Sequence, residues 1–143
     1  MFTEAVRENP EFKITLSMSG TFLEQAERFE PKVIRALQEL LDAGRENRQV
    51  EYLDETYYHS LSGLFADPWK KEFKDQVSLH RQKMKEIFGI RPTAFRNTEL
   101  MYNNEIGNVV ADMGFKAILC EQRRVRSKGS SIKRLSRSRE KFP

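Results

Sequence analysis

The chain has 143 residues, of which 38% are hydrophobic and 32% are charged. This length fits one domain, and the balance of apolar and charged residues excludes an intrinsically disordered protein. No apolar run approaches the roughly 20 residues that a membrane span requires, and residues 1–12 contain no apolar signal segment, so we expect no membrane partner. The single cysteine, Cys120, cannot form an internal disulfide, which favours a cytoplasmic location.

The basic character of the chain is confined to its C-terminal segment. Residues 121–143 carry nine Lys or Arg and two Glu, a charge of +7, so residues 1–120 carry −3 of the total of +4. The segment is rich in Ser and Arg and has no apolar periodicity. We therefore predict a folded domain over 1–120 and a disordered tail over 121–143. Nucleic-acid binding would depend on this tail alone, which makes nucleic acid a disfavoured partner.

The first half of the folded part is predicted to be strand, helix and strand. Residues 12–20 alternate between apolar and polar side chains and end at Gly20, which predicts a strand followed by a turn. A helical pattern follows over 22–41, and Pro31 within it should kink the helix or divide it in two. Residues 50–59 are rich in β-forming side chains and are the second predicted strand.

The second half repeats this alternation. A helix is predicted to begin at Pro68, with Asp67 as its N-cap. A third strand and its exit loop are predicted over 93–100, a third helix over 103–115 and a short apolar strand over 116–120. Strands that alternate with helices indicate an α/β fold with a parallel sheet and right-handed crossovers.

Three of the predicted strands end in polar or ionisable side chains. These groups are Ser17 and Ser19, the segment 54–59 and the segment 96–99. The carboxyl ends of parallel strands meet at one edge of a sheet, and ligands bind there in such folds. The sequence therefore predicts a binding or active site at this edge.

Glu99 is the main candidate in this cluster. It could be a nucleophile or general acid/base, or a surface carboxylate that caps the following helix, and the pattern alone does not decide between these. Arg96 could hold Glu99 ionised or pair with it at the surface. His59 follows Tyr58, and an aromatic beside a histidine at a strand end suits sugar stacking with a hydrogen bond, although a half-buried structural histidine fits the same pattern.

The remaining candidates have simpler interpretations. Glu24 could reach the site or could be a first-turn residue favoured by the helix dipole. His80 lies on an apolar helix face, which indicates a core or interface histidine, and Cys120 ends a buried strand as a structural thiol. The sequence contains no Gly-rich phosphate loop, no CxxC motif and no local zinc-ligand cluster, so we expect no cofactor and no metal.

Three blocks of sequence resemble consecutive blocks of glycoside hydrolase family 57, in particular its alpha-amylase-like branch. They read "FKITLSMSGTFLEQ", "EYLDETYYHSLSGLF" and "GIRPTAFRNTELMYNNEIGNVVADMGFKAILCE". The resemblance covers roughly residues 10–121. It implies an incomplete (β/α)7 barrel that acts on alpha-glucans with retention of configuration, using a Glu nucleophile and an Asp general acid/base.

The resemblance also implies roles for single residues. Glu99 stands at the nucleophile of the "FRNTE" block, and His59 matches the histidine of the "YYH" block beside the active site. Tyr58, Arg96 and Glu24 are the further residues that we expect to contact an alpha-glucan substrate. A retaining enzyme needs two carboxyl groups about 5–5.5 Å apart, and Glu99 supplies one of them.

The chain departs from the family pattern at both ends. No His-Gln-Pro motif precedes Phe12, and after Cys120 a Ser/Arg run replaces the expected barrel sequence, as a frame shift or mis-called gene end would produce. We therefore expect a partial barrel, truncated at both ends and inactive alone because its acid/base Asp is missing. Exposed sheet edges would favour self-association. Whether the isolated chain is an enzyme, an alpha-amylase or a 4-alpha-glucanotransferase stays open.

Two other functions are compatible with parts of the sequence. A degenerate barrel could bind carbohydrate without cleaving it, or the basic tail could bind nucleic acid in a salt-dependent manner. A polysaccharide deacetylase of related architecture is disfavoured, because that chemistry uses a metal held by His and Asp and the chain lacks the paired histidines.

Overall fold

The computed structural model describes residues 1–123 and 128–134. Its helices are α1 (Phe2–Glu8), α2 (Gly20–Phe29), α3 (Pro31–Ala43), α4 (Lys71–Phe88) and α5 (Asn104–Asp112). Its strands are β1 (Ile14–Leu16), β2 (Val50–Tyr52), β3 (Ala94–Arg96), β4 (Ala117–Arg123) and β5 (Lys128–Arg134), and short 3₁₀ turns form η1 (Ser62–Leu64) and η2 (Thr98–Leu100). None of these helices combines the length and the apolar character needed to cross a membrane.

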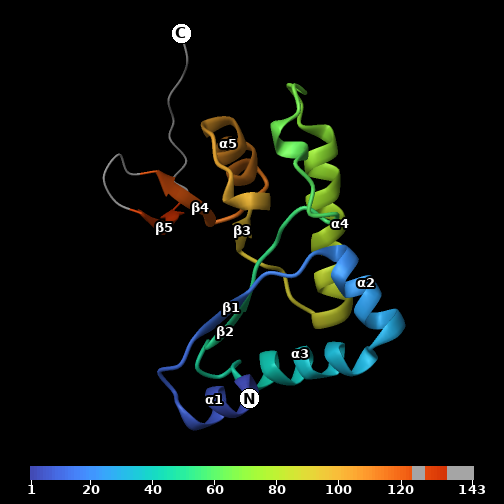
Figure 1. Ribbon diagram of the computed structural model, residues 1–143, viewed down its shortest axis with the longest axis vertical. Helices are drawn as coiled ribbons and strands as arrows, with labels where there is room; N and C mark the ends of the chain where they lie inside the picture. The colour runs from blue at the N-terminus through green and yellow to red at the C-terminus, as the bar shows by residue number, and fades with distance from the viewer. Residues whose placement is uncertain (124–127, 135–143) are drawn as a thin grey trace.

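The first four strands are parallel, as the alternation of strands and helices predicts. β1 pairs with β2, and β3 pairs with β4. A bridge between Asp54 and Phe95 joins the two pairs: the Asp54 amide donates to the Ala94 carbonyl at 3.0 Å, and the Arg96 amide donates to the Asp54 carbonyl at 2.8 Å. Figure 1 shows β1 and β2 with α1 and α3 at one end of the molecule and β3, β4 and α5 toward the other. Because these pairings are all parallel, the carboxyl ends of the four strands lie at one edge of the sheet.

The helices differ from the predicted pattern in two places. Pro31 divides the first helical pattern into α2 and α3, as predicted. The next helix, α4, begins at Lys71 and not at Pro68. The carboxylate of Asp67 accepts hydrogen bonds from the amides of Trp69, at 3.0 Å, and Lys71, at 2.6 Å, so these residues form a turn before the helix. Because these amides bond to the Asp67 carboxylate, the helix begins three residues later than predicted.

The other difference is α1, which the sequence pattern does not indicate because one short helix shows little periodicity. Gln49 anchors the end of this helix and the segment after it. Its buried side-chain amide lies 2.9 Å from the carbonyls of Val6 and Asn9 and 3.0 Å from that of Phe12.

The chain after Cys120 also differs from the expected tail. β4 continues to Arg123, and the backbone over Lys128–Arg134 pairs antiparallel with it as β5. The sequence pattern does not predict this strand, because the segment is rich in Ser and Arg and shows no apolar alternation. The predicted disorder of 124–127 and 135–143 concerns residues outside the described part of the chain, and the domain boundary after residue 120 stays a prediction.

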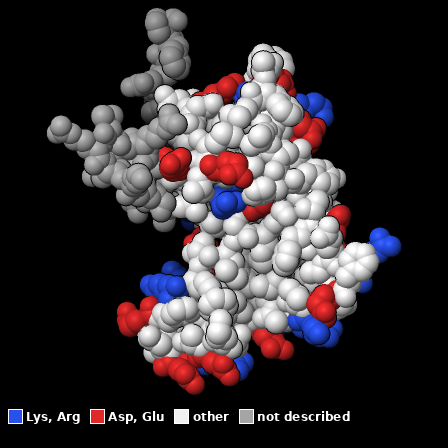
Figure 2. Space-filling model, in the orientation of Figure 1, with Lys and Arg blue, Asp and Glu red and all other residues white. Residues whose placement is uncertain are grey.

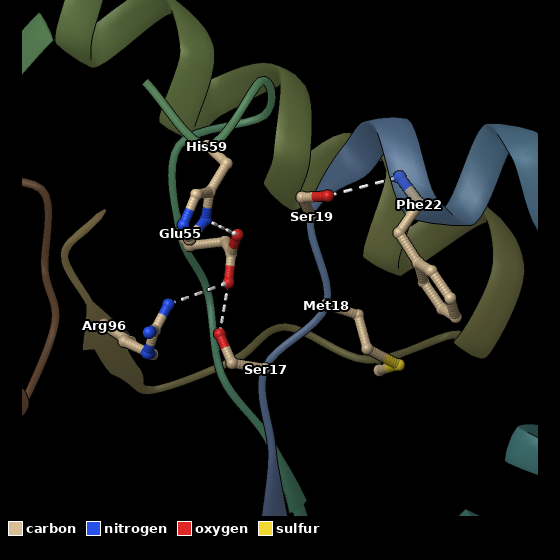
Figure 3. Close-up of a pocket in the computed structure, with 7 residues that line it drawn as sticks. All are labelled: Ser17, Met18, Ser19, Phe22, Glu55, His59 and Arg96. Carbon is tan, nitrogen blue, oxygen red and sulfur yellow. Dashed lines mark hydrogen bonds and ion pairs between the residues drawn. The ribbon is translucent and has the colours of Figure 1, made fainter. Parts of the chain in front are cut away.

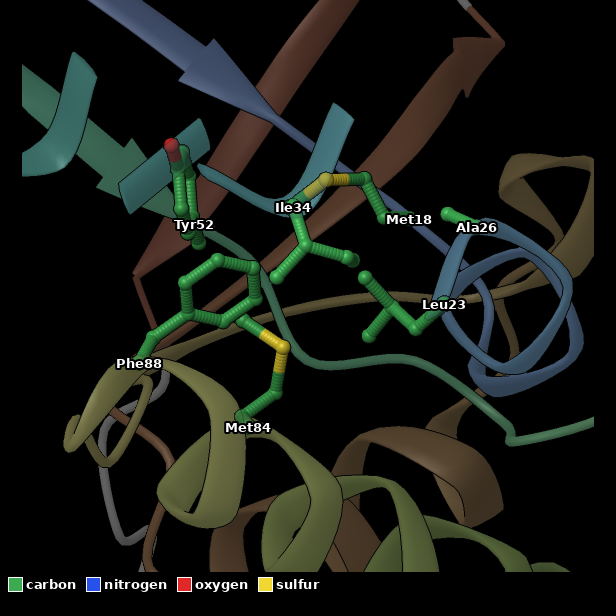
Figure 4. Close-up of a cluster of buried hydrophobic side chains, with 7 residues drawn as sticks. All are labelled: Met18, Leu23, Ala26, Ile34, Tyr52, Met84 and Phe88. Atoms are coloured by element: carbon green, nitrogen blue, oxygen red, sulfur yellow. The ribbon is translucent and has the colours of Figure 1, made fainter. Parts of the chain in front are cut away.

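Two clusters of buried apolar side chains support the two strand pairs. The first lies between α2, α3, α4 and the β1–β2 pair (Figure 4), and its members are Met18, Leu23, Ala26, Ile34, Tyr52, Met84 and Phe88. Within it, the Tyr52 ring meets the Phe88 ring edge-on at 5.1 Å, and the Tyr52 hydroxyl donates to the Leu37 carbonyl at 2.7 Å. Burial raises the pKa of Tyr52 above its usual range, so the phenol keeps the proton that it donates.

The second cluster lies between α4, α5 and the β3–β4 pair. Its members are Phe73, Val77, Phe95, Ile106, Val110, Phe115 and Ile118. Phe95, which is fully buried, contacts the rings of Phe73 at 5.6 Å and Phe115 at 5.3 Å. Because α4 contributes to both clusters, it holds the two strand pairs together, and the site forms where they meet.

Candidate functional site

The ends of three parallel strands border one open hollow of about 490 Å³. Figure 3 shows its lining, which consists of Ser17, Met18, Ser19, Phe22, Glu55, His59 and Arg96. Ser17 follows β1, Glu55 follows β2, and Arg96 ends β3. The predicted convergence of polar strand ends is therefore present in the structure.

Glu55 lies at the centre of the polar contacts in this hollow. Its side chain is only 3% exposed. The Ser17 hydroxyl donates to Oε2, His59 Nδ1 lies 3.0 Å from Oε1, and an Arg96 guanidinium nitrogen lies 3.9 Å from Oε2 (Figure 3). A buried carboxylate without such partners would cost several kcal/mol. Glu55 therefore ties together side chains from all three strand ends.

His59 is held in an uncommon backbone conformation. Its φ is 53°, in the left-handed region, and its amide donates to the Thr56 carbonyl at 3.0 Å. The ring is 41% exposed, and its Nε2 lies 3.9 Å from Oε1 of Glu99. The structure thus brings His59 and Glu99 to the same edge, although the two residues are forty positions apart in the sequence.

Glu99 lies on the turn η2 after β3. Its φ is 54° and that of Leu100 is 55°, so the turn contains two consecutive left-handed residues. The Thr98 hydroxyl lies 3.1 Å from the Thr56 hydroxyl, and the Asn97 side-chain amide donates to the Met101 carbonyl at 3.0 Å. Left-handed conformations of non-glycine residues cost about 1–3 kcal/mol each and concentrate at functional sites. These bonds keep the Glu99 side chain, which is 72% exposed, at the strand edge.

Three of the predicted site residues do not line the hollow: Glu99, Glu24 and Tyr58. Glu24 lies on α2, where the Tyr57 hydroxyl donates to its Oε1 at 2.6 Å. Burial and this bond to Glu24 raise the pKa of Tyr57. Tyr58 is exposed and stands edge-on to the Tyr57 ring at 5.0 Å. Substrate contacts by Glu24 and Tyr58 stay predictions.

A second polar network lies behind the site. Asp54 and His80 are both fully buried and bonded to each other through His80 Nδ1. Arg81 Nε lies 3.2 Å from the other Asp54 oxygen, and His80 Nε2 lies 2.7 Å from the Met18 carbonyl. Burial by itself lowers the pKa of His80, but the bond to Asp54, its charge, the Met18 carbonyl and the charge of Glu55 outweigh it, so the pKa is raised. The predicted core position of His80 is confirmed.

Ser17 and Glu55 contact each other in the site but were not among the residues predicted to bind substrate or to act in catalysis. Both stand in the segments predicted to converge, but a pattern of polar strand ends does not say which side chain faces the site. The alternation of side chains along an extended segment carries that information, because Asp54 and Glu55 must point in opposite directions. Within residues 1–123 and 128–134, no group of three or more His, Cys, Asp or Glu is placed to hold a metal ion.

Comparison with known sequences identifies relatives of the chain. The sequence model described as "Glycosyl hydrolase family 57" matches residues 1–141. A curated protein of Methanocaldococcus jannaschii, named "Putative alpha-amylase", is 43% identical over 111 residues. This match covers 78% of the present chain and 22% of the relative, so the chain spans about a fifth of the length of that protein.

Solved structures share the fold at low sequence identity. The 4-alpha-glucanotransferase of Thermococcus litoralis superposes with a TM-score of 0.66 at 20% identity, over 82% of this chain and 17% of that one. A family 4 carbohydrate esterase of Streptomyces lividans gives 0.59 at 19% identity, over 85% and 54% of the two chains. A polysaccharide deacetylase-like protein of Mycobacterium smegmatis gives 0.58 at 19%, over 92% and 43%. These likenesses show that the described strands and helices form part of an α/β barrel.

Proposed function

Because the chain belongs to glycosyl hydrolase family 57, we propose that it carries the nucleophile-bearing part of a site that cleaves or transfers alpha-glucans. In this proposal Glu99 is the nucleophile of a retaining reaction. The observation that supports it most directly is the position of the exposed Glu99 carboxylate, 3.9 Å from His59 Nε2 at the common edge of the strands. A nucleophile must be accessible to the sugar, and the exposure of the Glu99 side chain supports this role.

The chemistry assigns distinct tasks to the residues at this edge. The Glu99 carboxylate attacks the anomeric carbon, the glycosidic C–O bond breaks, and a glycosyl ester forms on Glu99. A second carboxyl group must protonate the leaving oxygen and later deprotonate the attacking water. Glu55 is a poor candidate for that group because Ser17 and His59 already occupy its oxygens. We therefore expect the isolated chain not to turn over unactivated glucans.

Arg96 and Tyr58 complete the proposed site. Arg96 reaches the hollow beside Glu55 and can donate hydrogen bonds to sugar hydroxyls. Tyr58 exposes its ring next to His59, where it can stack on the apolar face of a pyranose. Glu24, which is turned toward Tyr57, is proposed only to border the substrate path.

A sugar with an activated leaving group tests the nucleophile without an acid catalyst. In 5-fluoro-α-glucosyl fluoride, the carboxylate displaces fluoride, which leaves without protonation, and the 5-fluoro group slows loss of the ester. We expect mass spectrometry of peptides to find the sugar on Glu99 and the Glu99→Gln variant to remain unlabelled.

Glu39 provides a control for this labelling, because it is another exposed glutamate, on α3. A Glu39→Gln variant should be labelled like the original chain. A folded chain that carries the sugar on another carboxylate, or that binds maltooligosaccharides and is never labelled, would contradict the proposal. The second outcome would favour a non-catalytic carbohydrate-binding protein.

A further inference from the structure

Asp54 and Glu55 are consecutive buried carboxylates that leave the end of β2 in opposite directions. Asp54 points toward α4, and Glu55 points into the hollow beside Ser17. Each of them bonds to Nδ1 of a histidine, Asp54 to His80 and Glu55 to His59. The two histidines differ in what faces their second nitrogen, and this difference determines their protonation.

His80 faces acceptors on both sides of its ring. Nδ1 meets the Asp54 carboxylate, and Nε2 lies 2.7 Å from the Met18 carbonyl. A carboxylate and a carbonyl can only accept hydrogen bonds, so both ring nitrogens of His80 must carry protons. His80 is therefore an imidazolium within the core, compensated by Asp54.

Within the part of the chain that the structure describes, one acceptor lies within hydrogen-bond distance of the His59 ring. Its Nδ1 lies 3.0 Å from Oε1 of Glu55, whose other oxygen accepts from the Ser17 hydroxyl and faces the Arg96 guanidinium. These surroundings suit an ionised carboxylate, which accepts and does not donate. In the neutral imidazole the proton is then on Nδ1, and Nε2 carries a lone pair.

The lone pair of His59 Nε2 faces the proposed position of the sugar. The ring is 41% exposed, and the Glu99 carboxylate at 3.9 Å is an acceptor that cannot bond to an unprotonated Nε2. A hydroxyl is the complementary group at this place, because it has a hydrogen to donate and is carried by every pyranose.

We infer that Glu55 is a positioning residue, which fixes the proton of His59 on Nδ1 so that Nε2 accepts a hydrogen bond from a hydroxyl of the sugar bound at Glu99. The part of this inference that concerns the sugar rests on the proposed function. The part that concerns the tautomer rests only on the contacts of Glu55 and can be tested without any sugar.

Nitrogen-15 NMR of the imidazole rings tests the tautomer in the free 143-residue chain. The chain contains two histidines, so the spectrum has two ring systems, and a His59→Asn variant assigns them. For the neutral imidazole of His59 we expect protonated-type Nδ1 and unprotonated-type Nε2 shifts. For His80 we expect two protonated-type shifts at a pH low enough for it to be charged.

Variants at the two carboxylates separate positioning from general stability. Glu55→Ala should move His59 toward the Nε2-protonated tautomer and, at a pH low enough for His80 to be charged, leave both His80 nitrogens protonated. Asp54→Asn is the matched control, which should alter His80 and leave the His59 tautomer unchanged. An original chain in which His59 carries its proton on Nε2 overturns the inference even if Glu55→Ala does not fold.

Addition of maltopentaose tests the second part. We expect the His59 Nε2 resonance to move toward lower frequency, as for a nitrogen that accepts a hydrogen bond, with the proton still on Nδ1. A bound sugar that leaves Nε2 unmoved overturns the hydroxyl contact. If no sugar binds, the proposed function is contradicted. The tautomer assignment is then still decided by the spectrum of the free chain.

Discussion

His80 and Asp54 form a charged pair from which water is excluded on both sides. The structure explains this burial by the acceptors around the ring and by Arg81, whose Nε lies 3.2 Å from Asp54 Oδ2 and whose second contact is the Met113 carbonyl at 3.3 Å. The pair joins the end of β2 to α4, and through Met18 to the end of β1. Removal of one partner from such a pair costs about 3–5 kcal/mol, because the other charge is left buried alone.

We predict that this pair makes the stability of the chain depend on pH. The pKa of His80 is raised above 6.5 in the folded chain, so its stabilisation is complete below pH 6.5 and is lost as the pH rises through the folded-state pKa. The ring contacts Asp54 and the Met18 carbonyl, Arg81 contacts the other oxygen of Asp54, and the charge of Glu55 adds to the rise in the pKa of His80. Urea unfolding should therefore give a free energy of unfolding that falls as the pH is raised above about 6.5.

A His80→Gln variant provides the comparison for this measurement. It should be less stable than the original chain at about pH 6 and should lose most of the fall in stability above about pH 6.5. An equal slope in both proteins would show that another group titrates.

The individual side chains of the site were predictable to different degrees. His59, Arg96 and Glu99 stand out because a polar group after an apolar strand is unusual, and the structure places them together. Glu55 was not predicted as a site residue because it is one of several polar residues in its segment. The burial of its side chain is what distinguishes it from them. Burial of a carboxylate depends on partners that are distant in sequence, Ser17 among them, and a local pattern does not contain them.

The start of α2 lies very close to the ring of Tyr57. Ser19 is the N-cap, and its hydroxyl accepts from the Phe22 amide at 3.2 Å. Gly20 follows, and a Cβ placed on it would lie 2.3–2.5 Å from the ring of Tyr57. The absence of a side chain at Gly20 therefore lets α2 lie directly against the segment that leads to His59.

We predict that Gly20→Ala destabilises the chain. Alanine at a helix position ordinarily stabilises, but here the Tyr57 ring must move, and overpacking costs about 1–3 kcal/mol. Differential scanning calorimetry should show a lower Tm. Gln25→Ala, at an exposed position of the same helix, is the control and should leave Tm almost unchanged. A Tm of Gly20→Ala at or above that of the original chain would contradict the close contact.

The order of helices and strands could be derived from apolar periodicity, but their bounds could not. The predicted strand over 50–59 is regular only over Val50–Tyr52. Asp54 still bridges to Phe95, and the residues after it leave the sheet toward the site. α5 begins as the sequence indicated, with Asn103 accepting from the Ile106 amide at 2.8 Å. The cap at Asn103 is thus readable from sequence, whereas Asp67 forms a turn before its helix and the end of a strand is decided by tertiary contacts.

The chain as a whole consists of two packed units that share α4. The β1–β2 pair lies on one apolar cluster and the β3–β4 pair on the other, and the Asp54–Phe95 bridge connects them. Charged side chains of both signs are spread over the face seen in Figure 2, with pale, uncharged areas between them. Trp69 and Phe29 are large apolar side chains that remain exposed, at 78% and 71%.

We expect these exposed apolar side chains to make the 143-residue chain self-associate. Sedimentation velocity should show a sedimentation coefficient that increases with protein concentration. Replacing Trp69 and the exposed Phe65 by Ser should reduce this increase, whereas Lys32→Ser, at an exposed charged position, should not. A single monomeric species at every concentration would contradict the expectation.

The central claim is that the edge where the strands end, between His59 and Glu99, receives the anomeric carbon of an alpha-glucan. A crystal structure of the chain after reaction with 5-fluoro-α-glucosyl fluoride measures this directly. We predict continuous density from the Glu99 carboxylate to the anomeric carbon, with a sugar hydroxyl at hydrogen-bond distance from His59 Nε2. A sugar attached to or seated at any other part of the chain, with Glu99 unmodified, would contradict the account.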